Sequence, residues 1–367
     1  MVKHTPPDRG GKTDGTQVAA APSAQPIPSL FPPGTALTAA TGAVGALIFS
    51  WLGVPAALLL GPMTATLILA LSGVPLAYPR WLQAGVLGLI GISVGGSLTP
   101  DLLGQAALWL PSVGGQVAAH LLALAVGCLT MRYMARQSFE TAFLASYPGH
   151  LIMVLSAAAS GKADSRIVAI AQSFRLVVLV AAVPLVVGSV ESARPAPALD
   201  DLHPLDVLTV VGAGLFGIAA ARMIRMPSPP LMGGILGAGA AAMLGFSLGP
   251  IPDMIGDGLL AVVGTMIGAR FAGMSRRMLL ASIPQCAVTV FAVLFTVAAV
   301  AWVMSLLLGL PFGQVLLAYS PGGADVMPLL ALAQGHDAVY VGVHHGVRLL
   351  TMAVLLPIAM RMFSARI

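Results

Sequence analysis

The fold of this chain is decided by a stretch that occurs twice, SYPGH at Ser146–His150 and YSPGG at Tyr319–Gly323. The copies are 173 positions apart, and the same interval separates Arg175 from Arg348. A period this long cannot be the unit of a solenoid, whose repeats have about 20 to 50 residues. The interval therefore indicates a duplicated domain, and duplication within an apolar chain is typical of many transporters.

The composition is that of a membrane protein. Of 367 residues, 57% are hydrophobic and 8% charged, and the mean hydropathy is +0.93. A soluble domain carries about a quarter charged residues, whereas here apolar runs of roughly 17–25 residues recur, each long enough to cross a bilayer. We therefore predict an all-α polytopic membrane protein. Cys128 and Cys286 lie singly in apolar segments, which predicts buried thiols rather than a disulfide or metal site.

The apolar segments predict two membrane repeats. We expect a disordered cytoplasmic tail at 1–34, a first repeat at 35–190, an external linker at 191–204 and a second repeat at 205–362. Each repeat contains six candidate segments, at 35–52, 56–73, 81–98, 108–131, 141–160 and 166–188 in the first and at 205–221, 229–247, 256–274, 278–304, 314–333 and 338–360 in the second.

The loop charges indicate that the two repeats are inverted. Arg80, Arg132 and Arg136 lie in first-repeat loops whose counterparts hold no Lys or Arg, whereas Arg222 and Arg276 map back onto uncharged positions. Basic residues mark the cytoplasmic side, so corresponding loops are expected on opposite sides, which needs an odd number of crossings per repeat. We therefore predict five crossings and one re-entrant or broken hairpin in each repeat, with both termini in the cytoplasm.

The hairpins are expected at 141–160 and 314–333, where Pro-Gly interrupts an apolar segment. Proline removes a backbone donor and glycine allows the chain to turn, and such backbone is tolerated at membrane depth where it lines a wet cavity. Free N–H groups at a helix start can hold a small anion, although carbonyls at a broken helix can equally bind a cation. The residues predicted to bind substrate at the breaks are Pro148, Gly149, Ser320, Gly322 and Gly323.

Arg175 and Arg348 lie near the middle of their segments, where a charge is costly. One interpretation is that they hold an anionic substrate. The other is that each guanidinium caps the carbonyls freed by its hairpin, a task for which its five donors are suited. Both interpretations stay open, because an intramembrane charge favours function whereas recurrence in both repeats favours a scaffold.

Residues that occur in only one of the two repeats are stronger candidates for a functional role. Asp325 has Ile152 as its counterpart and is predicted to bind a coupling proton or sodium ion, with an ion pair to Arg348 as the alternative. His344 and His345 can titrate near neutral pH and are predicted to take part in ion coupling. The alternative is that one of the two is buried and hydrogen-bonded while the other faces a cavity.

Small residues predict close helix packing. Gly91 and Gly95 recur as Gly264 and Gly268 and are expected where helices cross. Arg270, one turn from a predicted cytoplasmic end, is expected to extend toward the membrane interface.

With its duplicated halves, its Pro-Gly hairpins and the segment HHGVRLL at His344–Leu350, the chain resembles the AbrB family of bacterial inner-membrane proteins. The resemblance covers about residues 35–362 and includes YSPGGAD at Tyr319–Asp325, while His150 stands where the family pattern leads one to expect glycine. It implies the inner membrane and the architecture of secondary transporters with inverted repeats. Family members carry the labels ammonia monooxygenase and regulator.

Neither label is supported by the residues. Seven histidines, five of them scattered singly, do not form a copper site, and a DNA-binding regulator needs a soluble basic module. We expect a secondary transporter of a small anionic or zwitterionic metabolite, coupled to a proton or sodium ion. The alternative is a membrane-embedded sensor or regulator of gene expression that binds a ligand without transporting it.

The expected partners follow from this interpretation. They are a small-molecule substrate and membrane lipid, and a homodimer is left open. We expect no enzyme activity, because no nucleophile-base pair is visible, and we expect no cofactor, no metal and no direct contact with nucleic acid.

Overall fold

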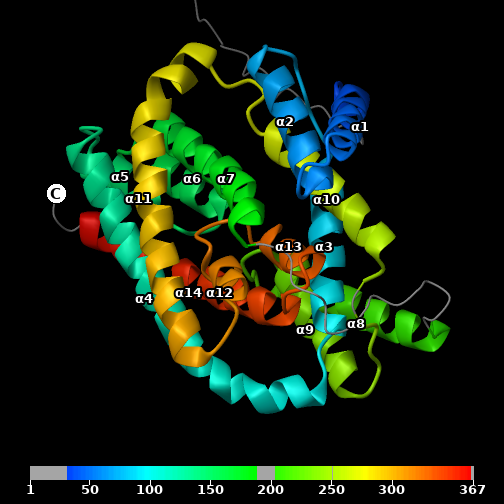
Figure 1. Ribbon diagram of the computed structural model, residues 1–367. Coiled ribbons are helices and arrows are strands. Elements are labelled where there is room, and N and C mark those ends of the chain that lie inside the picture. Colours follow the sequence, from blue (N-terminus) through cyan, green and yellow to red (C-terminus); the bar gives the residue numbers. More distant parts are fainter. Residues whose placement is uncertain (1–30, 188–202, 250, 365–367) are drawn as a thin grey trace, which may run out of the picture. The chain divides into compact units, whose positions relative to one another are not determined.

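The computed structural model describes residues 31–187, 203–249 and 251–364, which form fourteen α-helices and contain no strand (Figure 1). The all-α prediction is therefore confirmed at the level of fold class, while most of the predicted tail and linker lies outside the described residues. The helices of the first repeat are α1 Thr35–Trp51, α2 Ala57–Leu71, α3 Arg80–Gly96, α4 Pro100–Tyr133, α5 Phe139–Ser146, α6 Leu151–Ser160 and α7 Ser165–Val187. Those of the second are α8 Pro204–Met223, α9 Pro229–Met243, α10 Asp253–Ala269, α11 Arg276–Leu308, α12 Phe312–Tyr319, α13 Met327–Ala333 and α14 Ala338–Ser364.

The two sets of seven helices correspond in order, and four of the seven pairs agree in length to within one residue. Both α3 and α10 have 17 residues and begin 173 positions apart, at Arg80 and Asp253. Both α5 and α12 have 8 residues and begin at the same interval, at Phe139 and Phe312. The longest helices, α4 and α11, have 34 and 33 residues. The internal duplication thus extends from the motifs to the order of the helices.

The two predicted hairpins are each split into two short helices at Pro-Gly. Helix α5 ends before Tyr147 and helix α12 before Ser320, because the residue before proline is pushed out of the helical region. In the first hairpin α6 resumes at Leu151, but in the second α13 begins only at Met327. The expectation of a helix start directly at the break therefore holds for the first hairpin and is wrong for the second, where a loop follows the break.

Small residues bring helices of different repeats into close contact, as predicted. A Cβ added to Gly91 of α3 would lie 2.4 Å from the carbonyl oxygen of Leu231 in α9. A Cβ added to Gly264 of α10 would lie 2.3 Å from the carbonyl oxygen of Leu59 in α2. The glycines one turn further along α3 and α10 make equivalent contacts. The close pair α3–α9 in one half of the molecule is thus matched by the pair α10–α2 in the other.

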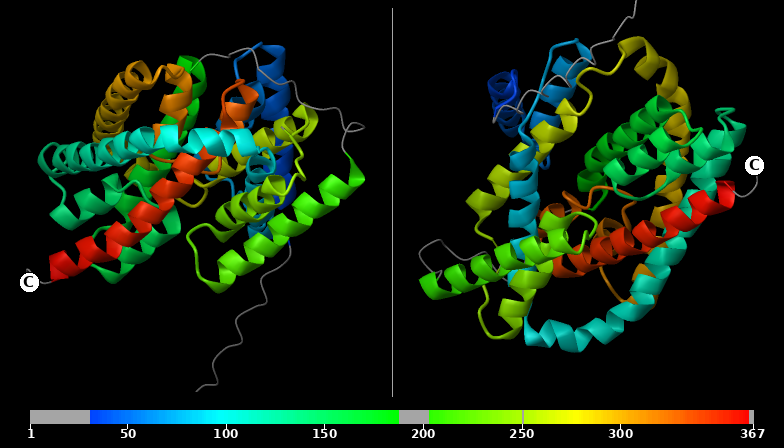
Figure 2. Two further views of the ribbon diagram at one scale, coloured as in Figure 1. Left: turned by 90° about the horizontal axis from the view of Figure 1, so that it is seen from below. Right: turned by 180° about the vertical axis from the view of Figure 1, so that it is seen from behind.

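The helices pack into two groups, and each group contains members of both repeats (Figures 1 and 2). The first group consists of two triplets, α1, α2 and α10 and α3, α8 and α9, which meet through α3 and α10. The second group consists of α4–α7 and α11–α14. The groups meet where α3 and α10 contact α7, α13 and α14. Each repeat therefore supplies its first three helices to one group and its last four to the other.

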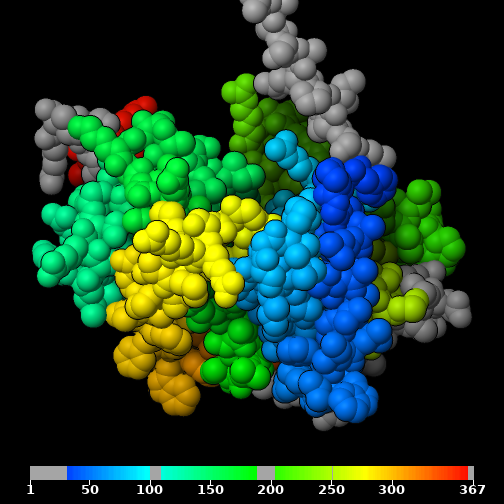
Figure 3. Space-filling view, turned by 90° about the horizontal axis from the view of Figure 1, so that it is seen from above, coloured from blue at the N-terminus to red at the C-terminus, as the bar shows by residue number. Residues whose placement is uncertain are grey.

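The outside of the helices is apolar. Five are long and apolar enough to cross a membrane, at Trp109–Tyr133, Ser165–Val187, Pro204–Met223, Arg276–Leu308 and Ala338–Met362. Large hydrophobic side chains such as Trp51 and Phe295 are exposed on several helices, and Figure 3 shows α1 and α2 side by side on one such face. An apolar surface of this extent suits lipid rather than water. These features indicate a membrane protein, while the count of ten crossings stays a prediction.

Candidate functional site

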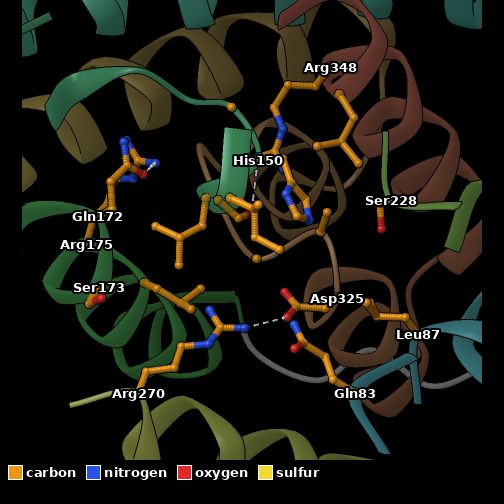
Figure 4. A pocket seen from close by; sticks show the side chains of 18 of the residues that line it. Gln83, Leu87, His150, Gln172, Ser173, Arg175, Ser228, Arg270, Asp325 and Arg348 are labelled. Carbon is orange, nitrogen blue, oxygen red and sulfur yellow. Dashed lines mark hydrogen bonds and ion pairs between the residues drawn. The ribbon is translucent and has the colours of Figure 1, made fainter. Parts of the chain in front are cut away.

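A cavity of about 210 Å³ lies where the two helix groups meet (Figure 4). The first group contributes the end of α10, the start of α3 and the segment before it, and the residue before α9. The second group contributes both hairpin breaks and the middle of α7 and α14. The polar and charged side chains of the lining that Figure 4 labels are Gln83, His150, Gln172, Ser173, Arg175, Ser228, Arg270, Asp325 and Arg348.

In the first hairpin, Arg175 holds the carbonyl groups at the break. Its guanidinium donates to the carbonyl oxygens of Ser146 and Tyr147 at 3.2 and 3.3 Å and to the side-chain oxygen of Gln172 at 2.6 Å. The Gln172 amide in turn donates to the carbonyl oxygens of Leu144 and Tyr147, both at 2.9 Å. One turn of α7 thereby satisfies the acceptors that the end of α5 leaves without helical partners.

The second hairpin is held in the same way by different residues. Arg348 donates to the carbonyl oxygens of Ser320 and Gly322. His345, which occupies the position equivalent to Gln172, places Nε2 3.0 Å from the carbonyl oxygen of Leu317, the counterpart of Leu144. We call the pairs Gln172/Arg175 and His345/Arg348 the hairpin clamps.

The clamps decide part of the question left open for the arginines. Arg175 and Arg348 are buried, and each caps carbonyl groups of its own hairpin. Both also line the cavity, and both lie near Gly322. The guanidinium of Arg348 donates to the Gly322 carbonyl at 3.1 Å, and Nε of Arg175 lies 3.9 Å from a Cβ placed on Gly322. The capping bonds that the scaffold interpretation expects are thus present, and the same two side chains also line the cavity.

An ion pair joins the two helix groups across the cavity. Nη2 of Arg270, at the end of α10, lies 3.2 Å from Oδ2 of Asp325 in the second hairpin, and the two side chains are only 16% and 19% exposed. The expectation that Arg270 extends toward the interface is therefore wrong, and so is the alternative that Asp325 pairs with Arg348. The sequence interval could not reveal this pair, because its members belong to different groups and neither recurs by the repeat.

The two adjacent histidines lie behind the second hairpin. His344 and His345 are fully buried and do not line the cavity, so the alternative in which one of them faces a cavity is wrong. Nδ1 of His344 lies 2.8 Å from the carbonyl oxygen of Tyr340, and Nε2 lies 3.0 Å from Oγ of Ser112 in α4. The first bond lies within α14, and the second connects α14 to α4.

The residues predicted at the breaks divide into two sets. Gly149, Gly322 and Gly323 line the cavity, whereas Pro148 and Ser320 do not. The Ser320 hydroxyl donates to a carbonyl of its own helix at 2.9 Å, so it is turned away from the break. Gly323 has a φ of +61°, a conformation that favours glycine and lets the loop turn into the cavity.

Several residues that line the cavity were not predicted from the sequence. Gln83, Ser173 and Ser228 are ordinary polar residues without a motif, and no sequence signal marks them. Gln172 could have been found, because it stands one turn before Arg175, where His345 stands before Arg348. Among the described residues, no three His, Cys, Asp or Glu side chains gather as a metal site would require.

Comparison with known proteins places the chain in a family. The family profile described as Transition state regulatory protein AbrB matches residues 58–364. The chain is 28% identical over 325 residues to the Putative regulator AbrB of Escherichia coli (strain K12), covering 84% of this chain and 90% of that protein. It is 26% identical over 303 residues to the Uncharacterized protein YhjN of Bacillus subtilis (strain 168), covering 76% and 77%. No solved structure matches the chain. The chain belongs to the AbrB family.

Proposed function

We propose that this chain is a secondary transporter of the inner membrane that carries a small anionic or zwitterionic metabolite by alternating access. The observation that carries the proposal is the position of the cavity between two helix groups, with both hairpin breaks and both clamp arginines in its lining. In transporters with inverted repeats, one bundle rocks against another around a central site of this kind.

The packing of α4 on α11 supports the inverted orientation of the repeats. A Cβ on Gly115 of α4 would lie 2.9 Å from Met304, late in α11, whereas one on Gly127 would lie 2.9 Å from Val293, earlier in α11. The two equivalent helices are therefore antiparallel, which a two-fold axis perpendicular to them produces. For helices that cross a bilayer this axis lies in the membrane plane, as in transporters with inverted repeats. We accordingly keep five crossings per repeat and both termini in the cytoplasm.

We assign substrate binding to Arg175 and Arg348 together with the lining glycines, and ion coupling to Asp325. Buried guanidinium groups that line a partly open cavity attract a carboxylate or similar anion more strongly than they would in water. A proton or sodium ion bound at Asp325 would weaken its ion pair with Arg270 and so free the hairpin to move relative to α10. His344 and His345 stay secondary candidates for coupling, because they are buried behind the hairpin.

Flux into proteoliposomes tests this proposal. The purified protein would be reconstituted and offered a panel of labelled small acids and amino acids under an imposed proton or sodium gradient. We expect uptake that depends on one gradient and loses this dependence in Asp325→Asn. Arg270→Gln is the matched control, because it breaks the same ion pair but keeps the carboxylate, and it should retain gradient dependence even if uptake slows. Gradient-driven uptake in Asp325→Asn equal to that of the wild type would remove Asp325 from the coupling role.

The second candidate is a membrane-embedded sensor, which the name of the family and of the Escherichia coli relative favours. Such a protein would bind a ligand in the same cavity but would not release it on the other side. A compound that raises the melting temperature of the purified protein by mass action, yet shows no flux under any gradient, would support the sensor. Flux of that compound would exclude a purely sensory role.

A further inference from the structure

We infer that the ligand of the cavity is a small dianion, held by two positive charges that the protein does not neutralise. This inference rests on the proposed function, because it specifies the charge of the substrate that the same cavity would take. It follows from the charges in the cavity lining and from their burial.

Three arginines and one aspartate line the cavity. Arg175, Arg270 and Arg348 contribute three positive charges, and Asp325 is the one carboxylate among the described lining residues. Asp325 is paired with Arg270 at 3.2 Å. The clamp arginines therefore form no ion pair of their own among the described residues.

The carbonyl groups that the clamp arginines bind do not cancel this charge. Arg348 donates to the carbonyl oxygens of Ser320 and Gly322, and Arg175 donates to those of Ser146 and Tyr147. These dipoles solvate the guanidinium groups, but each group keeps its full positive charge. At membrane depth an unbalanced charge is costly, so a ligand that supplies two negative charges gains more than one that supplies a single charge.

The geometry lets one small ligand meet both charges. Both guanidinium groups lie near Gly322, which lines a cavity of about 210 Å³. A dicarboxylate with a short carbon chain, or an inorganic dianion such as sulfate, has the size and charge for this space.

Succinate and succinamate provide a matched pair of probes. Both have the same carbon chain and nearly the same size, but at neutral pH succinate carries two negative charges and its monoamide succinamate carries one. The dissociation constants of both would be measured on the purified, detergent-solubilised full chain, by calorimetry and by the shift in melting temperature. We expect succinate to bind the wild-type protein at least about tenfold more tightly, a difference of about 1.4 kcal/mol.

A series of variants that change the net charge of the cavity lining tests whether charge or shape causes the preference for succinate. Arg270→Gln lowers the net charge of the lining by one and should reduce the preference for succinate, whereas Asp325→Asn raises the charge by one and should increase it. The double variant Asp325→Asn/Arg270→Gln removes the ion pair but restores the wild-type net charge, so its preference should return toward the wild-type ratio. Arg80→Gln, at an exposed arginine outside the cavity lining, is the control for loss of a positive charge elsewhere and should leave the ratio unchanged.

The outcomes distinguish the inference from the proposed function. Equal binding of succinate and succinamate, or a ratio that does not follow the charge of the variants, would overturn the inference while leaving an anion site in place. If neither probe nor sulfate binds but a monoanion or an amino acid does, the dianion is likewise excluded. If no compound of the panel binds and none is transported, the proposed function fails together with the inference.

Discussion

At the scale of single residues, the hairpin clamps give His345 a structural role. The ordinary titration range of histidine would otherwise make this residue a candidate for ion coupling. His345 and Gln172 occupy equivalent positions, and each binds the carbonyl group of an equivalent leucine, Leu317 and Leu144. A glutamine amide has no proton to exchange near neutral pH, so the shared task needs only a hydrogen-bond donor. The imidazole of His345 is therefore replaceable if the clamp is its whole role.

We accordingly expect His345→Gln to keep the stability of the wild type. His345→Ala should lower the free energy of unfolding by about 1–3 kcal/mol, because it leaves the buried Leu317 carbonyl without its donor. Chemical unfolding in detergent measures both, and Gln172→His is the reciprocal control in the other hairpin. A glutamine variant that unfolds as easily as the alanine variant would contradict the clamp. One that stays stable but loses gradient-dependent flux would return His345 to the coupling role.

At the scale of helices, the close contacts of α3 with α9 depend on the absence of a side chain at Gly91 and Gly95. Gly91 faces the Leu231 carbonyl of α9, whereas Gly85 in the same helix is exposed and has no atom within 4 Å of a Cβ placed on it. Substitution by alanine is therefore expected to have opposite effects on stability at Gly91 and at Gly85.

Gly91→Ala should destabilise the protein by about 1–3 kcal/mol, because the added methyl group forces α3 and α9 apart. Gly85→Ala should be neutral or stabilising by up to about 1 kcal/mol, because alanine favours the helix. Unfolding in a mixed-detergent titration compares the two variants directly. Equal stability of both would mean that the α3–α9 contact is looser than the geometry indicates.

The helices also show which features of the fold could be predicted from the sequence. Both hairpin splits were predictable, because Pro-Gly acts on the backbone locally and the repeat doubles the signal. The start of α13 at Met327 was not predicted, although Pro328 in its first turn is a local signal for a helix start. The pairing of Arg270 with Asp325 could not be predicted from the sequence, because it depends on how the two helix groups meet. Asymmetric residues carry no repeat signal, and their partners are fixed only by tertiary packing.

At the scale of the whole molecule, the antiparallel contact of α4 with α11 and the uneven loop charges both favour inverted repeats. Trp51, at the end of α1, and Met223, at the end of α8, are structurally equivalent, and their side chains are 85% and 83% exposed. If the repeats are inverted, these two positions lie on opposite sides of the membrane. If the repeats are parallel, they lie on the same side.

Labelling of single cysteines at these positions decides between the two arrangements. In a background with Cys128→Ala and Cys286→Ala, which removes the two buried thiols, Trp51→Cys and Met223→Cys would be treated in intact spheroplasts with a maleimide that cannot cross the membrane. We expect Trp51→Cys to be labelled directly and Met223→Cys only after lysis, because the arginines beside Met223 favour the cytoplasmic side. Direct labelling of both cysteines, or of neither before lysis, would mean that the repeats are parallel. The cavity would then lack the two-sided symmetry on which alternating access depends.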